Sequence, residues 1–185
     1  MDEEEILEVL SEVTSREDRV ETESSHSKYR GLGEGKNLIV IQMEAIQDFV
    51  IGRTYGGEEI TPNLNKLLEK DTIYFDNYFC NTGKGNTADA EFSSMNSLYP
   101  LIDGEIYRLY EENTFNGLPW LLREEGYNPF VVHGYKGEFW NRENAYPNQG
   151  FQDYISMEDL VEDEIIGTDT LKDVLQESFI KIFTQ

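Results

Sequence analysis

A hydroxyl side chain, that of Thr87, lies where a glycine-rich turn leads into a predicted helix, within residues 80–92. Gly83 and Gly85 permit backbone conformations that other residues avoid, and the first turn of a helix presents N–H groups that favour a phosphate or another anion. Thr87 is therefore a candidate nucleophile for phosphoester chemistry. The alternative is that Thr87 only caps the helix predicted over 88–98, because threonine is favoured at helix caps.

A carboxylate, Glu44, ends the apolar run of residues 37–44, which is preceded by Gly35 and Lys36. This run predicts a buried parallel strand. Ligands of open α/β sheets bind beyond the carboxyl ends of the strands, so Glu44 is placed to hold a metal or a substrate group. The alternative is a solvated charge at the end of a strand. Together with Thr87, Glu44 would form half of a site for a hard cation.

Strands and helices alternate along the rest of the chain. We predict a helix from Thr61-Pro62 through Leu68, an aromatic strand over 72–79, a helix over 118–125 and a strand over 130–133. This order predicts an α/β fold in which helices flank a mostly parallel sheet with right-handed crossovers.

The strand over 130–133 ends in His133, and Trp140 and Arg142 follow shortly after it. A histidine taken alone is more often structural than functional, but a strand-end position favours a functional role here. Trp140 is equally consistent with a core position. An indole face can nevertheless pack on a bound ligand, and an arginine can contact a phosphate through two hydrogen bonds.

Four segments of the chain resemble one known family in their residues, order and spacing. They are residues 37–49 with Met-Glu-Ala-Ile-Gln, residues 59–67, residues 82–92 with Asn-Ser-Leu-Tyr at 96–99, and His133-Gly followed by Phe-Trp-Asn-Arg at 139–142. Over roughly residues 30–166 the chain resembles the N-terminal half of the extracellular catalytic domain of lipoteichoic acid synthases, in the sulfatase and alkaline phosphatase superfamily.

The resemblance implies a sulfatase/alkaline-phosphatase-like fold and a role for each candidate residue. Thr87 would be the nucleophile and, with Glu44, a ligand of a divalent metal, Mn²⁺ or Mg²⁺. His133, Trp140 and Arg142 would bind the substrate in a glycerol-phosphate pocket. The implied reaction transfers glycerophosphate from phosphatidylglycerol, through a covalent intermediate on Thr87, to the end of a glycerophosphate polymer.

Two other functions remain open. One is a sulfatase-like phosphoesterase or hydrolase, in which water resolves the intermediate. A sulfatase itself would use a cysteine or serine converted to formylglycine, a conversion that Thr87 cannot undergo. The other is a non-catalytic remnant that binds a glycerophosphate group or another protein.

Departures from the family pattern favour a truncated relative with little activity of its own. The family completes its metal site with an Asp-His pair, but the only histidines here are His26 and His133, and neither follows an aspartate. Tyr135 stands where a short polar residue is usual. Beyond Gly167 the resemblance fades, so the remaining half of the site would have to lie on another segment or polypeptide.

Composition limits the partners of this 185-residue chain. Its 15 basic and 37 acidic residues give a formal net charge of −22, which argues against nucleic acid and against adsorption to an anionic membrane. The acidic excess would attract a cation. The single cysteine, Cys80, excludes an internal disulfide and is expected to be a small buried residue at a strand end.

We divide the chain into two parts. Residues 1–35 read as an acidic amphipathic helix with Ile6, Leu7, Leu10 and Val13 on one face, then a serine-rich linker, together a stalk. Residues 36–185 read as a partial catalytic domain. The chain shows neither an apolar stretch of about 20 residues nor a leader. The resemblance implies the extracellular face of the cell membrane, with the anchor elsewhere.

Overall fold

The computed structural model describes residues 28–159 and 179–184. The chain divides into two compact units, Met1–Asn37 and Leu38–Gln185, which are treated separately. In the first unit, residues 28–35 form consecutive turns. The amphipathic helix and most of the linker predicted for residues 1–35 lie outside the described residues, so the stalk stays a prediction. All elements below belong to the second unit.

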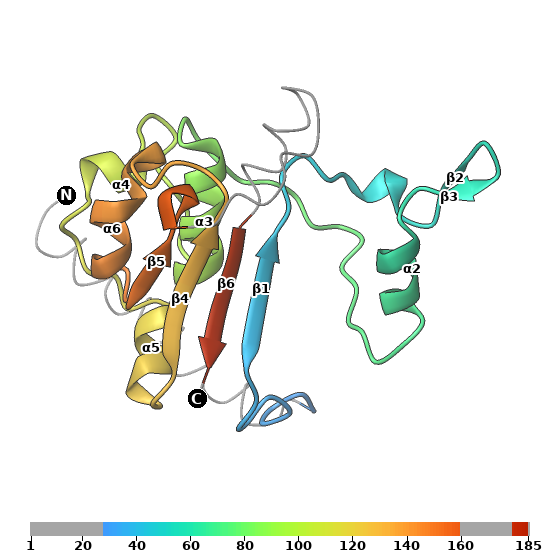
Figure 1. Cartoon of the computed structure of the whole chain (residues 1–185), viewed down its shortest axis with the longest axis horizontal. Helices are drawn as coiled ribbons and strands as arrows, with labels where there is room; N and C mark the ends of the chain where they lie inside the picture. The colour runs from blue at the N-terminus through green and yellow to red at the C-terminus, as the bar shows by residue number, and fades with distance from the viewer. Residues whose placement is uncertain (1–27, 160–178, 185) are drawn as a thin grey trace, which may run out of the picture. The chain divides into compact units, whose positions relative to one another are not determined.

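The second unit is built on a four-stranded sheet in the order β1-β6-β4-β5 (Figure 1). Its strands are β1 (Leu38–Gln42), β4 (Asn128–His133), β5 (Asp153–Ile155) and β6 (Phe179–Thr184). β4 pairs with β5 in parallel, whereas β6 runs antiparallel to both β1 and β4. β1, β4 and β5 therefore share one direction, and their carboxyl ends lie at the same edge.

The predicted α/β fold with flanking helices is confirmed, and the sheet is mixed because β6 runs against its neighbours. The prediction that residues 37–44 form a buried parallel strand is wrong. Within the described residues β1 is an edge strand, and its hydrogen-bonded partner is the antiparallel β6. Ile39 and Ile41 are exposed because no described element covers that face of β1.

One face of the sheet forms the core. Along β4, Pro129, Val131 and His133 are buried and alternate with more exposed residues, as expected for a strand with one covered face. In Figure 1, α3 (Asn86–Asn96) passes behind β4, and α4 (Ile106–Leu109) and α6 (Arg142–Asn148) lie to the left of β5. Their apolar side chains pack with the covered face in one cluster: Ala88, Phe92, Met95, Ile106, Tyr107, Val131, Ala145, Tyr146, Phe151 and Phe183.

The other predicted helices and the strand before His133 are also formed. α2 spans Pro62–Leu68 with proline in its first turn, and α5 spans Leu118–Glu124. α5 is followed by Gly126 with φ +86°, a conformation that glycine adopts without strain. β4 begins two residues before the predicted strand. Three single-turn 3-10 helices complete these connections: η1 (Asp48–Val50), η2 (Phe139–Asn141) and η3 (Met157–Asp159).

The strand predicted over residues 72–79 is absent, and the segment has no regular structure. Its aromatic side chains do not face a core: Phe75, Tyr78 and Phe79 are 71%, 81% and 80% exposed. A high β propensity describes a residue that fits a half-buried sheet, and no described strand pairs with this segment. Cys80, expected to be buried, is consequently exposed as well.

A short hairpin precedes α2 and was not predicted. β2 (Thr54–Tyr55) pairs antiparallel with β3 (Glu58–Glu59) across Gly56 and Gly57. Both glycines have positive φ, +61° and +91°, as a tight two-residue hairpin turn requires. None of the described helices is long and apolar enough to cross a membrane.

Candidate active site

A cavity of about 640 Å³ lies between the carboxyl end of β1 and the first turns of α3. Its size is typical of small-molecule sites. The loop after β1, the segment before α3, α3 itself and one residue of η2 form its walls. The lining residues are Gln42, Met43, Glu44, Ala45, Ile46, Gln47, Tyr78, Phe79, Cys80, Asn81, Thr82, Asn86, Thr87, Ala90, Ser93 and Trp140.

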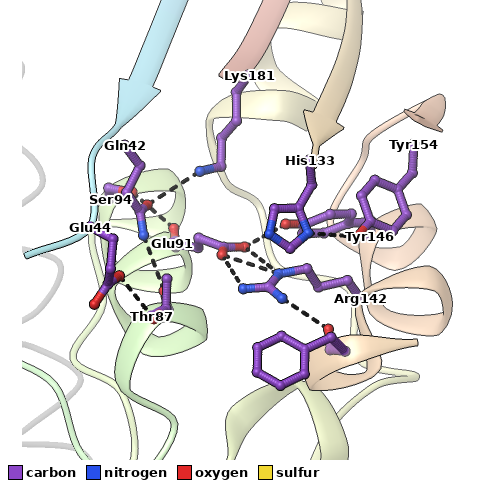
Figure 2. A network of polar contacts seen from close by, with 11 residues as sticks. Gln42, Glu44, Thr87, Glu91, Ser94, His133, Arg142, Tyr146, Tyr154 and Lys181 are labelled. Atoms are coloured by element: carbon purple, nitrogen blue, oxygen red, sulfur yellow. Dashed lines mark hydrogen bonds and ion pairs between the residues drawn. The ribbon is translucent and has the colours of Figure 1, made fainter. Parts of the chain in front are cut away.

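Thr87 and Glu44 meet in this cavity (Figure 2). The Thr87 Oγ1 donates a hydrogen bond of 3.2 Å to the Glu44 Oε2, although 43 residues separate the two positions. Thr87 is the second residue of α3 and makes no capping hydrogen bond, so the alternative that it serves as a helix cap is wrong. The structure brings the two predicted residues together at the predicted edge of the sheet.

The glycine-rich turn before α3 is held by Asp89, a residue that the sequence analysis missed. The backbone N–H groups of Gly83 and Gly85 both donate to the Asp89 Oδ2 at 2.9 Å. The amides of Gly83 and Gly85 are therefore bound by a carboxylate of the chain itself, whereas the N–H groups expected to attract a phosphate belong to the first turn of α3. Burial raises the pKa of Asp89 above its ordinary value, and the two backbone hydrogen bonds only partly oppose this rise.

Positions 83 and 85 require glycine because there is no space for a Cβ atom, and neither residue has a positive φ. A Cβ at Gly83 would lie 1.9 Å from the Leu101 carbonyl oxygen, and one at Gly85 would lie 2.3 Å from the Asp89 Oδ1. Contacts this short force the neighbouring atoms to move. The turn therefore places Thr87 through close packing against Asp89 and Leu101.

Replacing Gly85 by alanine is expected to destabilise the chain by about 1–3 kcal/mol, because the added methyl group overpacks the turn. Denaturant unfolding of the variant measures this. Gly33→Ala is the control, since a Cβ there meets nothing within 4 Å. The Asp89→Ala background should reduce the cost of Gly85→Ala, and an equal cost in both backgrounds would show that Asp89 does not set the requirement for glycine.

Strained backbone marks the same cavity. Ala45, Asn86 and Trp140 have φ of +54°, +43° and +60°, in a region that residues other than glycine rarely adopt. All three line the cavity, and Ala45 and Asn86 are direct neighbours of Glu44 and Thr87. Each such residue costs on the order of 1–3 kcal/mol, and such residues cluster at functional sites. The backbone geometry thus supports this cavity as the functional site.

Arg142 does not reach the cavity, so the prediction that it lines the pocket is wrong. Its side chain is fully buried, and its Nη2 and Nε donate to the Glu91 Oε1 at 2.7 and 3.2 Å (Figure 2). The Tyr146 hydroxyl donates to the other oxygen of the same carboxylate. Burial alone would raise the pKa of Glu91, but the charges of Arg142 and Lys181 and these hydrogen bonds hold it below its ordinary value.

His133 is buried as well, whereas Trp140 is where it was predicted. His133 is 1% exposed at the end of β4, and its Nδ1 lies 3.3 Å from the Tyr154 hydroxyl. Burial raises the pKa of Tyr154. The ring of Tyr135 packs edge-on against His133, with the ring centroids 6.3 Å apart. Of the three predicted substrate contacts, only Trp140 lines the cavity.

A sequence model of the family described as Sulfatase matches residues 36–182. The chain belongs to the sulfatase family. The curated relatives include lipoteichoic acid synthase 2 of Bacillus subtilis, 42% identical over 127 residues, which cover 68% of this chain and 20% of the relative. Lipoteichoic acid synthase 1 of the same organism is 40% identical over 147 residues, which cover 77% of this chain and 23% of the relative.

A solved structure agrees with these matches. The crystal structure of the lipoteichoic acid synthase LtaP from Listeria monocytogenes superposes with a TM-score of 0.73 at 31% identity, over 77% of this chain and 35% of that one. The predicted resemblance to lipoteichoic acid synthases is therefore confirmed. This sulfatase-family chain spans only about a fifth of the length of the curated relatives that it matches.

Thr87 and Glu44 fit part of a site for a hard divalent cation. Both offer oxygen, and two oxygens 3.2 Å apart can bind one ion, because such ligands lie about 2.0–2.6 Å from it. Within residues 28–159 and 179–184, however, no group of three or more histidine, cysteine, aspartate or glutamate side chains could hold a metal. Glu44 and Thr87 are therefore two candidate ligands at this cavity in the described part of the chain.

Gln42, Asp89 and Glu91 hold the candidate site together and were not predicted from the sequence. Asp89 could have been predicted from the sequence. An aspartate that closely follows a tight glycine turn can accept hydrogen bonds from the backbone N–H groups of that turn. No local sequence pattern indicated the role of Glu91, because its partner Arg142 lies 51 residues away. Gln42 was read only as part of an apolar strand.

Proposed function

We propose that this chain is the nucleophile-bearing part of a glycerophosphate transferase of the lipoteichoic acid synthase type. The hydrogen bond between Thr87 and Glu44 inside a cavity supports the proposal, since it places a hydroxyl nucleophile beside a metal-binding carboxylate. The similar proteins are lipoteichoic acid synthases. The remaining metal ligands would come from residues outside the described part of this chain.

Three residues that line the cavity have roles in this proposal. Glu44 and Thr87 would hold Mn²⁺ or Mg²⁺ through oxygen. When bound, such an ion lowers the pKa of the hydroxyl that it contacts and makes it a better nucleophile. The Thr87–Glu44 contact keeps the Thr87 Oγ1 within reach of an ion held by Glu44. Trp140 would pack its indole face on the glycerol unit.

The proposed reaction has two steps. Thr87 Oγ1 attacks the phosphorus of phosphatidylglycerol, which forms a P–O bond to the threonine and releases diacylglycerol with a proton on its hydroxyl. A hydroxyl at the end of a glycerophosphate polymer then attacks the same phosphorus and restores Thr87. With such a lipid donor, the protein would work at the outer face of the cell membrane.

His133 and Arg142 take a different role from the one that the resemblance implies. In the described conformation both are buried, and Arg142 contacts Glu91, one turn after Thr87 on α3. We propose that they hold α3 against the sheet and leave phosphate binding to the metal and to groups that line the cavity.

A glycerophosphate-binding protein without turnover is the second candidate. The described residues contain no complete group of metal ligands, which favours this alternative for the chain on its own. Binding would then use the same cavity but would leave no covalent product on Thr87. Detection of a covalent product separates the two functions.

Mass spectrometry of the protein tests the proposal. After long incubation with phosphatidylglycerol and Mn²⁺, we expect a glycerophosphate adduct on the peptide that contains Thr87, even where turnover is slow. Thr87→Ala should abolish the adduct. Thr82→Ala is the matched control, because Thr82 lines the same cavity and should leave the adduct intact. An absent adduct, or one that persists in Thr87→Ala, would contradict the proposal.

A further inference from the structure

Gln42 links β1 and β6 to the start of α3. It is the last residue of β1, two positions before Glu44, and its side-chain Nε2 donates to the Thr87 carbonyl oxygen at 3.2 Å. Its Oε1 accepts a hydrogen bond of 3.4 Å from the Lys181 Nζ of β6 (Figure 2). The end of β1 therefore contacts Thr87 twice, at the backbone carbonyl through Gln42 and at the hydroxyl through Glu44.

Lys181 and the Thr87 carbonyl oxygen together determine which way the Gln42 amide points, because the first only donates and the second only accepts. An amide can present either its oxygen or its NH₂ to a neighbour, but a lysine ammonium only donates. Lys181 is fully buried on the covered face of the sheet, so its ammonium is confined beside the Gln42 Oε1. This contact turns the Gln42 Nε2 toward the Thr87 carbonyl.

A threonine near the start of a helix has a competing conformation. Side chains rotate between staggered positions, and threonine in helices divides between two of them. The carbonyls three and four residues before Thr87, those of Lys84 and Gly83, precede α3, so the alternative rotamer of Thr87 has no helical carbonyl to bond. Only the other conformation directs Oγ1 at Glu44, and it requires the start of α3 to stay at a fixed distance from β1.

We propose that Gln42 is a positioning residue for Thr87, and that Lys181 helps to set the orientation of its amide. This inference rests on the proposed function, in which the Thr87 hydroxyl must face Glu44. It also makes β6 part of the site, although no residue of β6 lines the cavity.

Methyl NMR of threonine-labelled protein tests the inference without metal or substrate. Three-bond couplings to the Thr87 methyl group report its rotamer populations. The unmodified chain should show one dominant rotamer, and Gln42→Met should shift the ratio of the two rotamers by about fivefold, as expected for the loss of one hydrogen bond. Gln47→Met is the matched control, since Gln47 lines the same cavity and makes no side-chain hydrogen bond within the described residues.

Two further variants keep the test decisive where Gln42→Met fails to fold. Gln42→Glu keeps the contact with Lys181 and removes the donor to Thr87, so it should shift the rotamers as Gln42→Met does. Lys181→Met removes one of the two partners that orient the amide and should shift the rotamers in the same direction by a smaller amount. A Thr87 rotamer that is unchanged in folded Gln42 variants would overturn the inference. An adduct test that fails while the rotamers shift would refute the proposed function alone.

Discussion

Arg142→Ala is expected to destabilise the chain by about 3–5 kcal/mol, because it leaves a charged carboxylate buried without its main partner. Arg142 and Glu91 are both fully buried, and their side chains are joined at 2.7 Å. The Glu91 carboxylate would then keep the Tyr146 hydroxyl and the nearby charge of Lys181, but lose the three hydrogen bonds from the guanidinium. Denaturant unfolding, followed by circular dichroism, measures the change.

Arg108→Ala provides the matched control. Arg108 also pairs with a glutamate, Glu105, at 2.7 Å, but its side chain is 58% exposed. An exposed pair of this kind contributes no more than about 1 kcal/mol. Similar stability losses in the two variants would contradict the structural role of Arg142. A stable Arg142→Ala protein with weakened glycerol-phosphate binding in calorimetry would restore the substrate contact that the resemblance implied.

Local sequence signals predicted the elements that depend on nearby residues. Pro62 marked the start of α2, Gly126 marked the end of α5, and the alternation of strands and helices gave the α/β class. The strand predicted over residues 72–79 was wrong, because β propensity describes which residues fit a strand and not whether a partner strand is present. The antiparallel β6 was not predicted for a related reason, since pairing between strands far apart in the chain has no local signature.

The candidate site was predictable where chemistry and local position coincide. Glu44 follows a strand and Thr87 begins a helix, so each was placed from its own neighbours, and the two meet at 3.2 Å. The resemblance assigned Arg142 to the substrate through the matching Phe-Trp-Asn-Arg segment at residues 139–142. Its observed partner, Glu91, comes from packing α6 against α3, which a single sequence does not reveal. Residue type and local position thus predicted the candidate nucleophile, whereas the contacts that hold it in place became visible only in the fold.

Diacylglycerol release by the purified chain is expected to be at least about 100-fold slower than release by the full-length lipoteichoic acid synthase 1 of Bacillus subtilis in the same assay. Loss of even one supporting partner commonly lowers metal affinity or activity by about 10–100-fold. The described residues offer two candidate metal ligands, Glu44 and Thr87, and the sequence contains no Asp-His pair. An ion held by Glu44 and Thr87 alone would stay mostly hydrated, and the Thr87 hydroxyl would be poorly activated.

Fluorescent phosphatidylglycerol with a range of Mn²⁺ concentrations measures this release. The small residual rate should rise with Mn²⁺ well beyond the concentration that saturates the longer relative, because a two-ligand site binds weakly. Thr87→Ala should remove the residual rate, whereas Thr82→Ala should not. Fast, Thr87-dependent release of diacylglycerol at low Mn²⁺ would contradict the prediction that the metal site is incomplete. It would require further oxygen ligands from this chain, and the acidic positions between residues 160 and 178, outside the described residues, would be the first to replace by alanine.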